Sequence, residues 1–158
     1  MLISAVTPLF LKTSNRANGV DKAVFESIRG GLRADRAQFL SDFNTLFYGT
    51  NRKKDAVSAA ITTQTLNMGL LASIKATIDC VTAFSETDFR PDMKAFEIPT
   101  LVIHGTDDQV VPFEATGKLA AEMIRGASLR PHAARPHALP STHKVRVNED
   151  LLAFLKGS

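Results

Sequence analysis

Two adjacent aspartates and a set of histidines are the side chains of this sequence best suited to chemistry. Asp107 and Asp108 follow an apolar run over residues 98–104 that Gly105 ends. The apolar residues of this run are continuous rather than alternating, which is typical of a parallel strand covered on both faces. Catalytic and ligand-binding groups of open α/β sheets gather beyond the carboxyl ends of such strands. Asp also favours turns through local hydrogen bonds, so a plain turn is the alternative interpretation.

The second candidate segment, residues 134–143, carries His137 directly before the last helical pattern of the chain. A carboxylate bonded to one imidazole nitrogen fixes the tautomer of the ring and stabilises the imidazolium formed when the other nitrogen takes a proton. His104, inside the expected strand, is interpreted as a structural residue. The spacing of His132, His137 and His143 matches no known pattern of metal ligands, so the sequence predicts neither a metal nor another cofactor.

The elements that must position these side chains lie at the two ends of the chain. Residues 2–6 form a short apolar run with β-branched members and predict a buried strand. Helical spacing covers residues 20–46, where the pair Gly30 and Gly31 predicts a break between two helices. A long helix is expected over residues 55–84. After the strand at 98–104, further helices are expected following Pro112, with Gly126 as a C-terminal cap, and over residues 142–155.

This order of elements predicts an α/β fold with few parallel strands and an inserted helical cap. The helical block between the two strands is far longer than a usual crossover connection. We therefore expect residues 1–10 and 97–158 to form the α/β core and residues 11–96 to form the cap.

Composition and charge exclude several classes of partner. The chain has 158 residues, 44% of them hydrophobic, and a net charge of +3. Its densest basic cluster, residues 52–54, is followed at once by Asp55, so a solvated loop is expected and no nucleic-acid partner. No apolar run reaches the ~18 residues of a membrane span, so no membrane association is expected. The single Cys80 is expected to be buried and inert. The presence of only one cysteine and the lack of a basic leader before residue 6 predict a cytoplasmic protein.

Several stretches of the chain resemble bacterial aryl esterases, also called non-haem chloroperoxidases or perhydrolases, of the α/β-hydrolase superfamily. They are the two chemical segments above and residues 5–10, 35–49, 75–93 and 148–155. The resemblance implies that this chain is the C-terminal part of such a protein, with Asp108 as catalytic acid and His137 as catalytic base. It implies a small ester or carboxylic acid substrate, hydrogen peroxide in perhydrolysis, and no cofactor. It also implies an acyl pocket lined by Val6, Phe10, Phe43, Phe47, Phe84, Val110 and Val111.

A nucleophile is missing from the sequence. No serine lies in a G-x-S-x-G pattern, the usual strand-to-helix turn of a nucleophile, and Ser128 alone has a glycine two residues before it. In the family, the nucleophile and the oxyanion-hole donors precede the segment that residues 2–10 resemble. The sequence also departs from the family at residues 129–135, which lack alternation and contain Pro131, and at Ala138, where the family prefers glycine.

Three functional hypotheses follow. The chain could be a partial serine hydrolase that supplies acid and base and is inactive alone. It could be a non-catalytic truncated product, or an interaction protein that pairs with a full-length relative. It could also be a small-molecule binding module built on the phenylalanine-rich cap. Because the strand at residues 2–6 is expected to lack its first neighbour, we expect an exposed sheet edge. Such an edge predicts either low stability or association, as a homo-oligomer or with an N-terminal half.

Overall fold

A small parallel sheet forms the centre of the protein, whose computed structural model describes residues 1–157. Its strands are β1 (Leu2–Ile3), β2 (Leu101–Gly105) and β3 (Ser128–His132), in the order β1-β2-β3. Ile3 lies opposite Ile103, and Val102 lies opposite Leu129. All five residues of β2 are buried, as a central parallel strand requires. The predicted α/β class is confirmed, although β1 is shorter than the expected strand.

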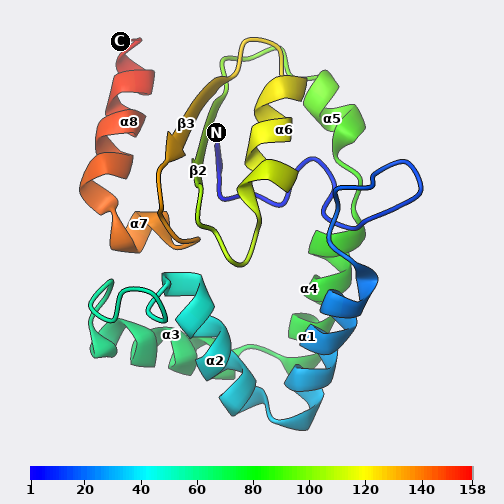
Figure 1. The fold of residues 1–158 in the computed structure, drawn as a ribbon, viewed down its shortest axis with the longest axis vertical. Helices are drawn as coiled ribbons and strands as arrows, with labels where there is room; N and C mark the ends of the chain where they lie inside the picture. Colours follow the sequence, from blue (N-terminus) through cyan, green and yellow to red (C-terminus); the bar gives the residue numbers. More distant parts are fainter. Residues whose placement is uncertain (158) are drawn as a thin grey trace.

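Helices cover both faces of this sheet (Figure 1). On one face lie α5 (Arg90–Lys94), the 3₁₀ turn η1 (Phe113–Ala115) and α6 (Gly117–Met123), with a core that includes Met93, Ala120 and Ile124. On the other face lie α7 (Leu139–Thr142) and α8 (Lys144–Lys156), whose side chains pack on Leu101 and Ile103. Pro112 thus precedes a 3₁₀ turn, and α6 ends before Gly126, which has the positive φ of a tight turn.

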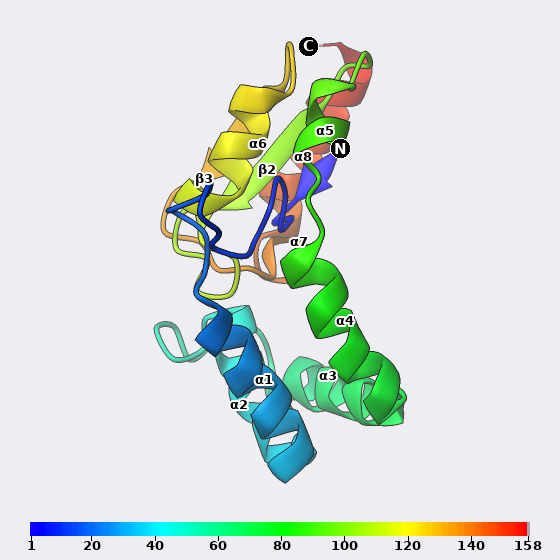
Figure 2. The same cartoon turned by 90° about the vertical axis from the view of Figure 1, so that its right-hand side faces the viewer.

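The four longer helices between β1 and β2 lie beyond the carboxyl ends of the strands (Figures 1 and 2). They are α1 (Lys22–Ala34), α2 (Arg36–Tyr48), α3 (Ala59–Leu71) and α4 (Ile74–Glu86). Their apolar core also contains side chains from the segment after β1 and from the turn after β2. Its buried members are Phe10, Phe25, Leu32, Val81 and Val111. The helical layer is therefore packed directly against the edge at which ligand groups of α/β sheets gather.

The break between the first two helices differs from the prediction. Helix α1 continues through Gly30 and Gly31, and the chain turns at Asp35, whose side chain accepts a hydrogen bond from the N–H of Gln38 at 2.9 Å. This N-cap begins α2 and outweighs the weak helix propensity of the glycines. Gly31 has a packing role, since a Cβ there would lie 2.4 Å from the ring of Phe39.

The long helix predicted over residues 55–84 is two helices. Ser73 caps α4 by accepting a hydrogen bond from the N–H of Ala76 at 3.3 Å, and α3 and α4 meet at 101°. Within residues 1–157, no single helix has the length and apolar character to cross a membrane. Among the described helices, only α3 and α4 taken together reach that length and apolar character, and they are bent where they meet.

Residues 129–135 depart from the family's strand pattern, yet their first half is part of a strand. β3 pairs with β2 from Ser128 to His132 and includes Pro131. β3 is an edge strand, and proline, which cannot donate a ladder hydrogen bond, is tolerated at a sheet edge. The last helix also begins later than predicted, because the short α7 turns the chain before α8.

Candidate catalytic acid and base

The carboxylate of Asp108 lies in the turn after β2 and is almost fully hydrogen-bonded. One oxygen, Oδ1, accepts from the backbone N–H groups of Val110 at 2.9 Å and Val111 at 2.7 Å. The other, Oδ2, lies 2.8 Å from Nδ1 of His137 and 3.2 Å from Nε2 of His104. Burial raises the pKa of Asp108, but the bonds from His104, His137 and the Val111 amide outweigh it and lower the pKa to about 2. The group is therefore an ionised carboxylate at neutral pH.

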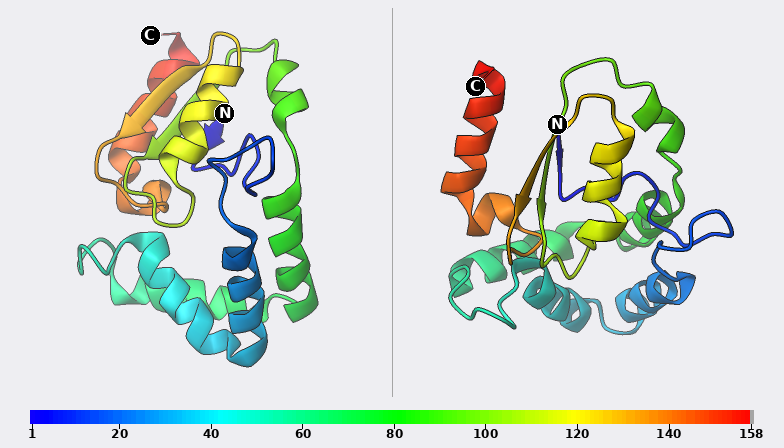
Figure 3. Two further views of the ribbon diagram at one scale, coloured as in Figure 1. Left: turned by 45° about the vertical axis from the view of Figure 1, so that its right-hand side comes forward. Right: turned by 45° about the horizontal axis from the view of Figure 1, so that its top comes forward.

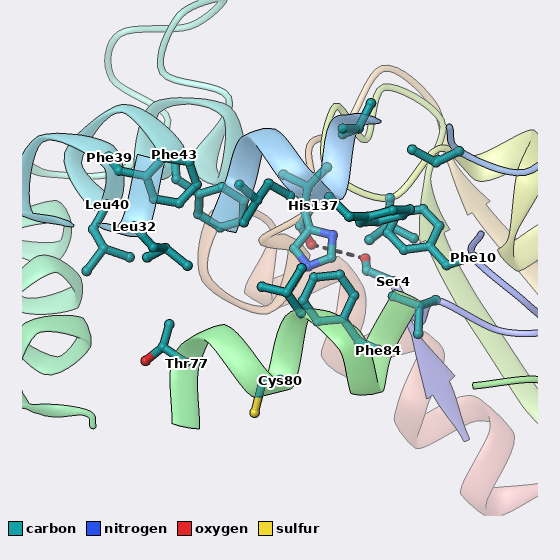
Figure 4. A pocket seen from close by; sticks show the side chains of 18 of the residues that line it. Ser4, Phe10, Leu32, Phe39, Leu40, Phe43, Thr77, Cys80, Phe84 and His137 are labelled. Atoms are coloured by element: carbon teal, nitrogen blue, oxygen red, sulfur yellow. Dashed lines mark hydrogen bonds between the residues drawn. The ribbon is translucent and has the colours of Figure 1, made fainter. Parts of the chain in front are cut away.

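The imidazole of His137 is held on several sides and keeps one nitrogen free. Its Nδ1 faces Asp108, and the ring of Phe47 packs against it with a centroid distance of 4.9 Å. Ser4 Oγ donates to the backbone carbonyl of His137 at 3.0 Å, and the N–H of Ala138 donates to the carbonyl of Phe47 at 3.0 Å. No residue of 1–157 bonds to Nε2, and the ring lines a cavity (Figure 4).

His104 is fully buried and contacts the same carboxylate, which the sequence did not reveal. Its Nε2 donates to the carbonyl oxygen of Val111 at 2.8 Å and lies 3.2 Å from Asp108 Oδ2. Its Nδ1 is buried without a hydrogen-bond partner in the described chain. His104 lies near the end of β2, and Asp108 follows four residues later in the loop. This short separation is the one signal that could have suggested the contact.

The loop that carries His137 is tied to the turn that carries Asp108. The N–H of Asp107 donates to the carbonyl of Arg135 at 3.1 Å, and the N–H of Thr106 donates to the carbonyl of His132 at 3.0 Å. This close approach needs Gly105, because a Cβ there would lie 2.2 Å from the Arg135 oxygen. The side chain of Asp107 is paired with Arg52 rather than with a histidine. Of the two candidate aspartates, the structure brings only Asp108 to His137.

Helices α1, α2 and α4 lie beyond the carboxyl edge of the sheet in both views of Figure 3. A cavity of about 650 Å³ opens beside His137, lined by residues of these helices and of the sheet edge (Figure 4). Its walls are almost entirely apolar. Six of the seven side chains that the family resemblance implied for the acyl pocket line it: Val6, Phe10, Phe43, Phe84, Val110 and Val111. Phe47 instead packs on the imidazole. Lining residues that the sequence did not single out include Phe25, Leu32, Phe39 and Leu40.

The expectation that Cys80 is buried is wrong. The residue is exposed and is one of the residues that line the open cavity (Figure 4). Successive helical residues are about 100° apart, so the inward position of Val81, which is 2% exposed, turns its neighbour Cys80 outward.

Among the described residues there is neither a metal-binding cluster nor a hydroxyl group bonded to the His137 ring. Within 1–157, no group of three or more His, Cys, Asp or Glu side chains could hold a metal ion. No hydroxyl of these residues bonds to the His137 ring, since Ser4 contacts the main chain of that residue.

The strand order, the covering helices and the acid–histidine pair at the strand tips define the class of protein: the fold is that of α/β-hydrolases. A bromoperoxidase from Bacillus anthracis superposes with a TM-score of 0.93 at 41% sequence identity, over 98% of this chain and 56% of that chain. An esterase from Exiguobacterium antarcticum superposes with a TM-score of 0.85 at 24% identity, again over 98% of this chain and 56% of the other.

Curated relatives give the narrower relationship. A bifunctional esterase/perhydrolase from Acinetobacter calcoaceticus and a non-heme chloroperoxidase from Streptomyces lividans are each 41% identical over 99% of this chain and 57% of their own length. No protein-family model matches the sequence. The chain spans little more than half the length of these relatives. It is homologous to the C-terminal part of the non-heme chloroperoxidases and esterases, and the predicted resemblance is confirmed.

Proposed function

We propose that Asp108 and His137 are the orienting acid and the general base of an acyl-transfer site that hydrolyses carboxylic esters. The observation that carries the proposal is the 2.8 Å contact between Asp108 Oδ2 and His137 Nδ1, on an imidazole that lines an apolar cavity. A carboxylate on Nδ1 keeps the proton there and leaves Nε2 as the proton acceptor.

The chemistry then follows from the free nitrogen. Nε2 takes the proton of a serine hydroxyl as its oxygen attacks the ester carbonyl, and the adjacent Asp108 carboxylate stabilises the imidazolium. The imidazolium returns the proton to the departing alcohol, which leaves an acyl-enzyme. Nε2 next deprotonates a water as its oxygen attacks the acyl carbonyl, and the imidazolium returns this proton to the serine oxygen as the carboxylic acid leaves. Hydrogen peroxide in place of water gives a peracid.

We propose that the nucleophile and oxyanion hole come from a segment outside this sequence, so the chain alone is inactive. Removal of a single oxyanion donor costs ~10²–10³ in turnover. A site without the nucleophile and all oxyanion donors should therefore show almost no turnover. The apolar walls of the cavity favour small esters with an aromatic or aliphatic acyl group.

Complementation tests this function. Hydrolysis of p-nitrophenyl acetate is measured for the chain alone and after refolding it with the N-terminal part of the Acinetobacter calcoaceticus relative that it does not match. We expect turnover only in the mixture, abolished by His137→Ala and reduced about 10³–10⁴-fold by Asp108→Asn.

The matched control is Asp107→Asn, which removes the neighbouring carboxylate and should leave turnover in the mixture nearly unchanged. Turnover by the chain alone, or undiminished turnover by the His137→Ala mixture, would contradict the proposal.

A non-catalytic role as an interaction protein is the second candidate, and the exposed side of β1 supports it. Among the described strands, β1 pairs with β2 alone, which leaves one edge open to another chain. We expect the chain in this role to co-purify with a full-length relative and to lose that association when the open edge is blocked. A mixture that gains turnover would favour the first candidate.

A further inference from the structure

A second cavity is lined by residues on both sides of His137 in the sequence and shares no lining residue with the apolar cavity. It measures about 260 Å³ and is lined by residues from the end of β3, the loop after it and the beginning of α8. Four of its six lining residues are basic side chains, and none is acidic: Pro131, His132, Ala133, Arg135, His143 and Arg146. We propose that this cavity binds a small oxyanion, such as a phosphate group.

Arg135 supplies the strongest attraction for such a ligand. Its side chain is exposed, and no residue of 1–157 forms a hydrogen bond or ion pair with its guanidinium group. The planar guanidinium offers parallel N–H groups that match the oxygens of phosphate or carboxylate. Removal of the side chain should spare the loop, since the loop is held through the backbone carbonyl of Arg135.

The opposite wall of the cavity is fixed by Asp150. His132 Nε2 lies 2.7 Å from Asp150 Oδ2, and Arg146 Nη2 lies 3.4 Å from Asp150 Oδ1, so both carboxylate oxygens are engaged. His132 has a side chain only 6% exposed, and its Nδ1 has no hydrogen-bond partner among residues 1–157. Arg146 also approaches Glu149 at 3.7 Å, but its side chain is 65% exposed and can turn towards a ligand.

The amino end of α8 adds to the positive potential. His143 is the N-cap of this 13-residue helix and makes no side-chain cap bond, and the first turn contains no acidic residue. Unsatisfied N–H groups and the helix dipole favour an anion at such an end. The local potential also acts on His143, whose pKa is lowered by burial and then by the neighbouring basic side chains, Arg135 first.

Titration with inorganic phosphate tests the site. The ring signals of the four histidines are followed by NMR while phosphate replaces chloride at constant ionic strength. We expect saturable shifts for His132 and His143 and none for the fully buried His104. Arg135→Ala should weaken phosphate binding about tenfold or more, because bonds to a charged group are lost.

Arg33→Ala is the matched control, because it removes an exposed arginine from α1, outside this cavity, and should leave phosphate affinity unchanged. The proposal is overturned if the shifts do not saturate, if all four histidines shift together, or if Arg33→Ala and Arg135→Ala weaken binding equally. Any of these results would mean that phosphate only screens the net positive charge of the chain.

Discussion

Asp108 shows how a nearly buried carboxylate stays ionised. Two backbone amides and the His137 imidazole donate to its oxygens, and the His104 imidazole lies 3.2 Å from Oδ2, so polar groups of the protein replace the water that burial removes. The same bonds bring the turn after β2, the interior of β2 and the β3–α7 loop to one point. A single side chain thus serves both the geometry of the candidate site and the stability of the fold.

We predict that Asp108 contributes roughly 2 kcal/mol to the free energy of unfolding at neutral pH. Its folded pKa of about 2 lies below the ordinary value of 3.8, so this contribution is complete above the unfolded pKa. It is lost as the pH falls through the folded pKa, between about pH 4 and about pH 2. Urea unfolding of the chain and of Asp108→Asn should therefore show a stability difference at neutral pH that shrinks across this acidic window.

Asp107→Asn is the control for this measurement, since it disrupts only a partly exposed pair with Arg52. Such pairs contribute about 0–1 kcal/mol. A stability difference for Asp108→Asn that stays constant from neutral pH to the acid limit would show that its ionisation is not the source.

Ala134 has a backbone conformation that suits glycine. Its φ is 54°, in the left-handed region that costs an L-residue about 1–2 kcal/mol. We predict that Ala134→Gly stabilises the chain by about 1 kcal/mol, measured by chemical unfolding. Ala133→Gly, in the same loop but without a positive φ, should instead destabilise it slightly. Equal effects of the two substitutions would show that the loop conformation is not strained.

At the scale of elements, local patterns of the sequence predicted the central strand and the acid turn well. Continuous apolar residues identify β2, and the position of Asp108 just after it follows from the chain alone. The contact between His104 and Asp108 could not be predicted, because it depends on how the turn folds back over the strand. The breaks at Asp35 and Ser73 were missed because caps there outweigh the propensities that suggested other boundaries. β3 was missed because an edge position tolerates Pro131.

The packing of α6 on β2 depends on the absence of a side chain at Gly117. A Cβ there would lie 2.4 Å from Nδ1 of His104, so helix and strand would have to move apart. We predict that Gly117→Ala lowers the free energy of unfolding by about 1–3 kcal/mol, as overpacked cores do. In urea unfolding, Gly30→Ala should do the opposite and stabilise by about 0.5–1 kcal/mol, because nothing lies within 4 Å of a Cβ there and alanine favours a helix. If Gly117→Ala were as stable as the unsubstituted chain, the close approach would be wrong.

At the scale of the whole molecule, apolar surface is exposed in three places. On α8, Val145 and Leu152 are 67% and 53% exposed and lie on one face of the helix. At the α3–α4 corner, Leu71 is 87% exposed. The open side of β1 is a third such place. From these surfaces we predict that the chain associates with another chain rather than remaining a stable monomer.

The edge of β1 gives the sharpest test of this association. Ser4 N–H donates to Ile103, so the alternation of a strand directs the N–H of Ile3 to the open side. We predict that the chain self-associates in sedimentation, with a melting temperature that rises with protein concentration. Ile3→Pro removes the outward donor and should weaken association, whereas Ile3→Val retains it and controls for lost packing. Leu71→Glu, on the distant corner, should leave association through β1 unchanged. A monomer with a sharp melting transition at the same high temperature across all concentrations would contradict association through β1. The open side of β1 would then not destabilise the chain.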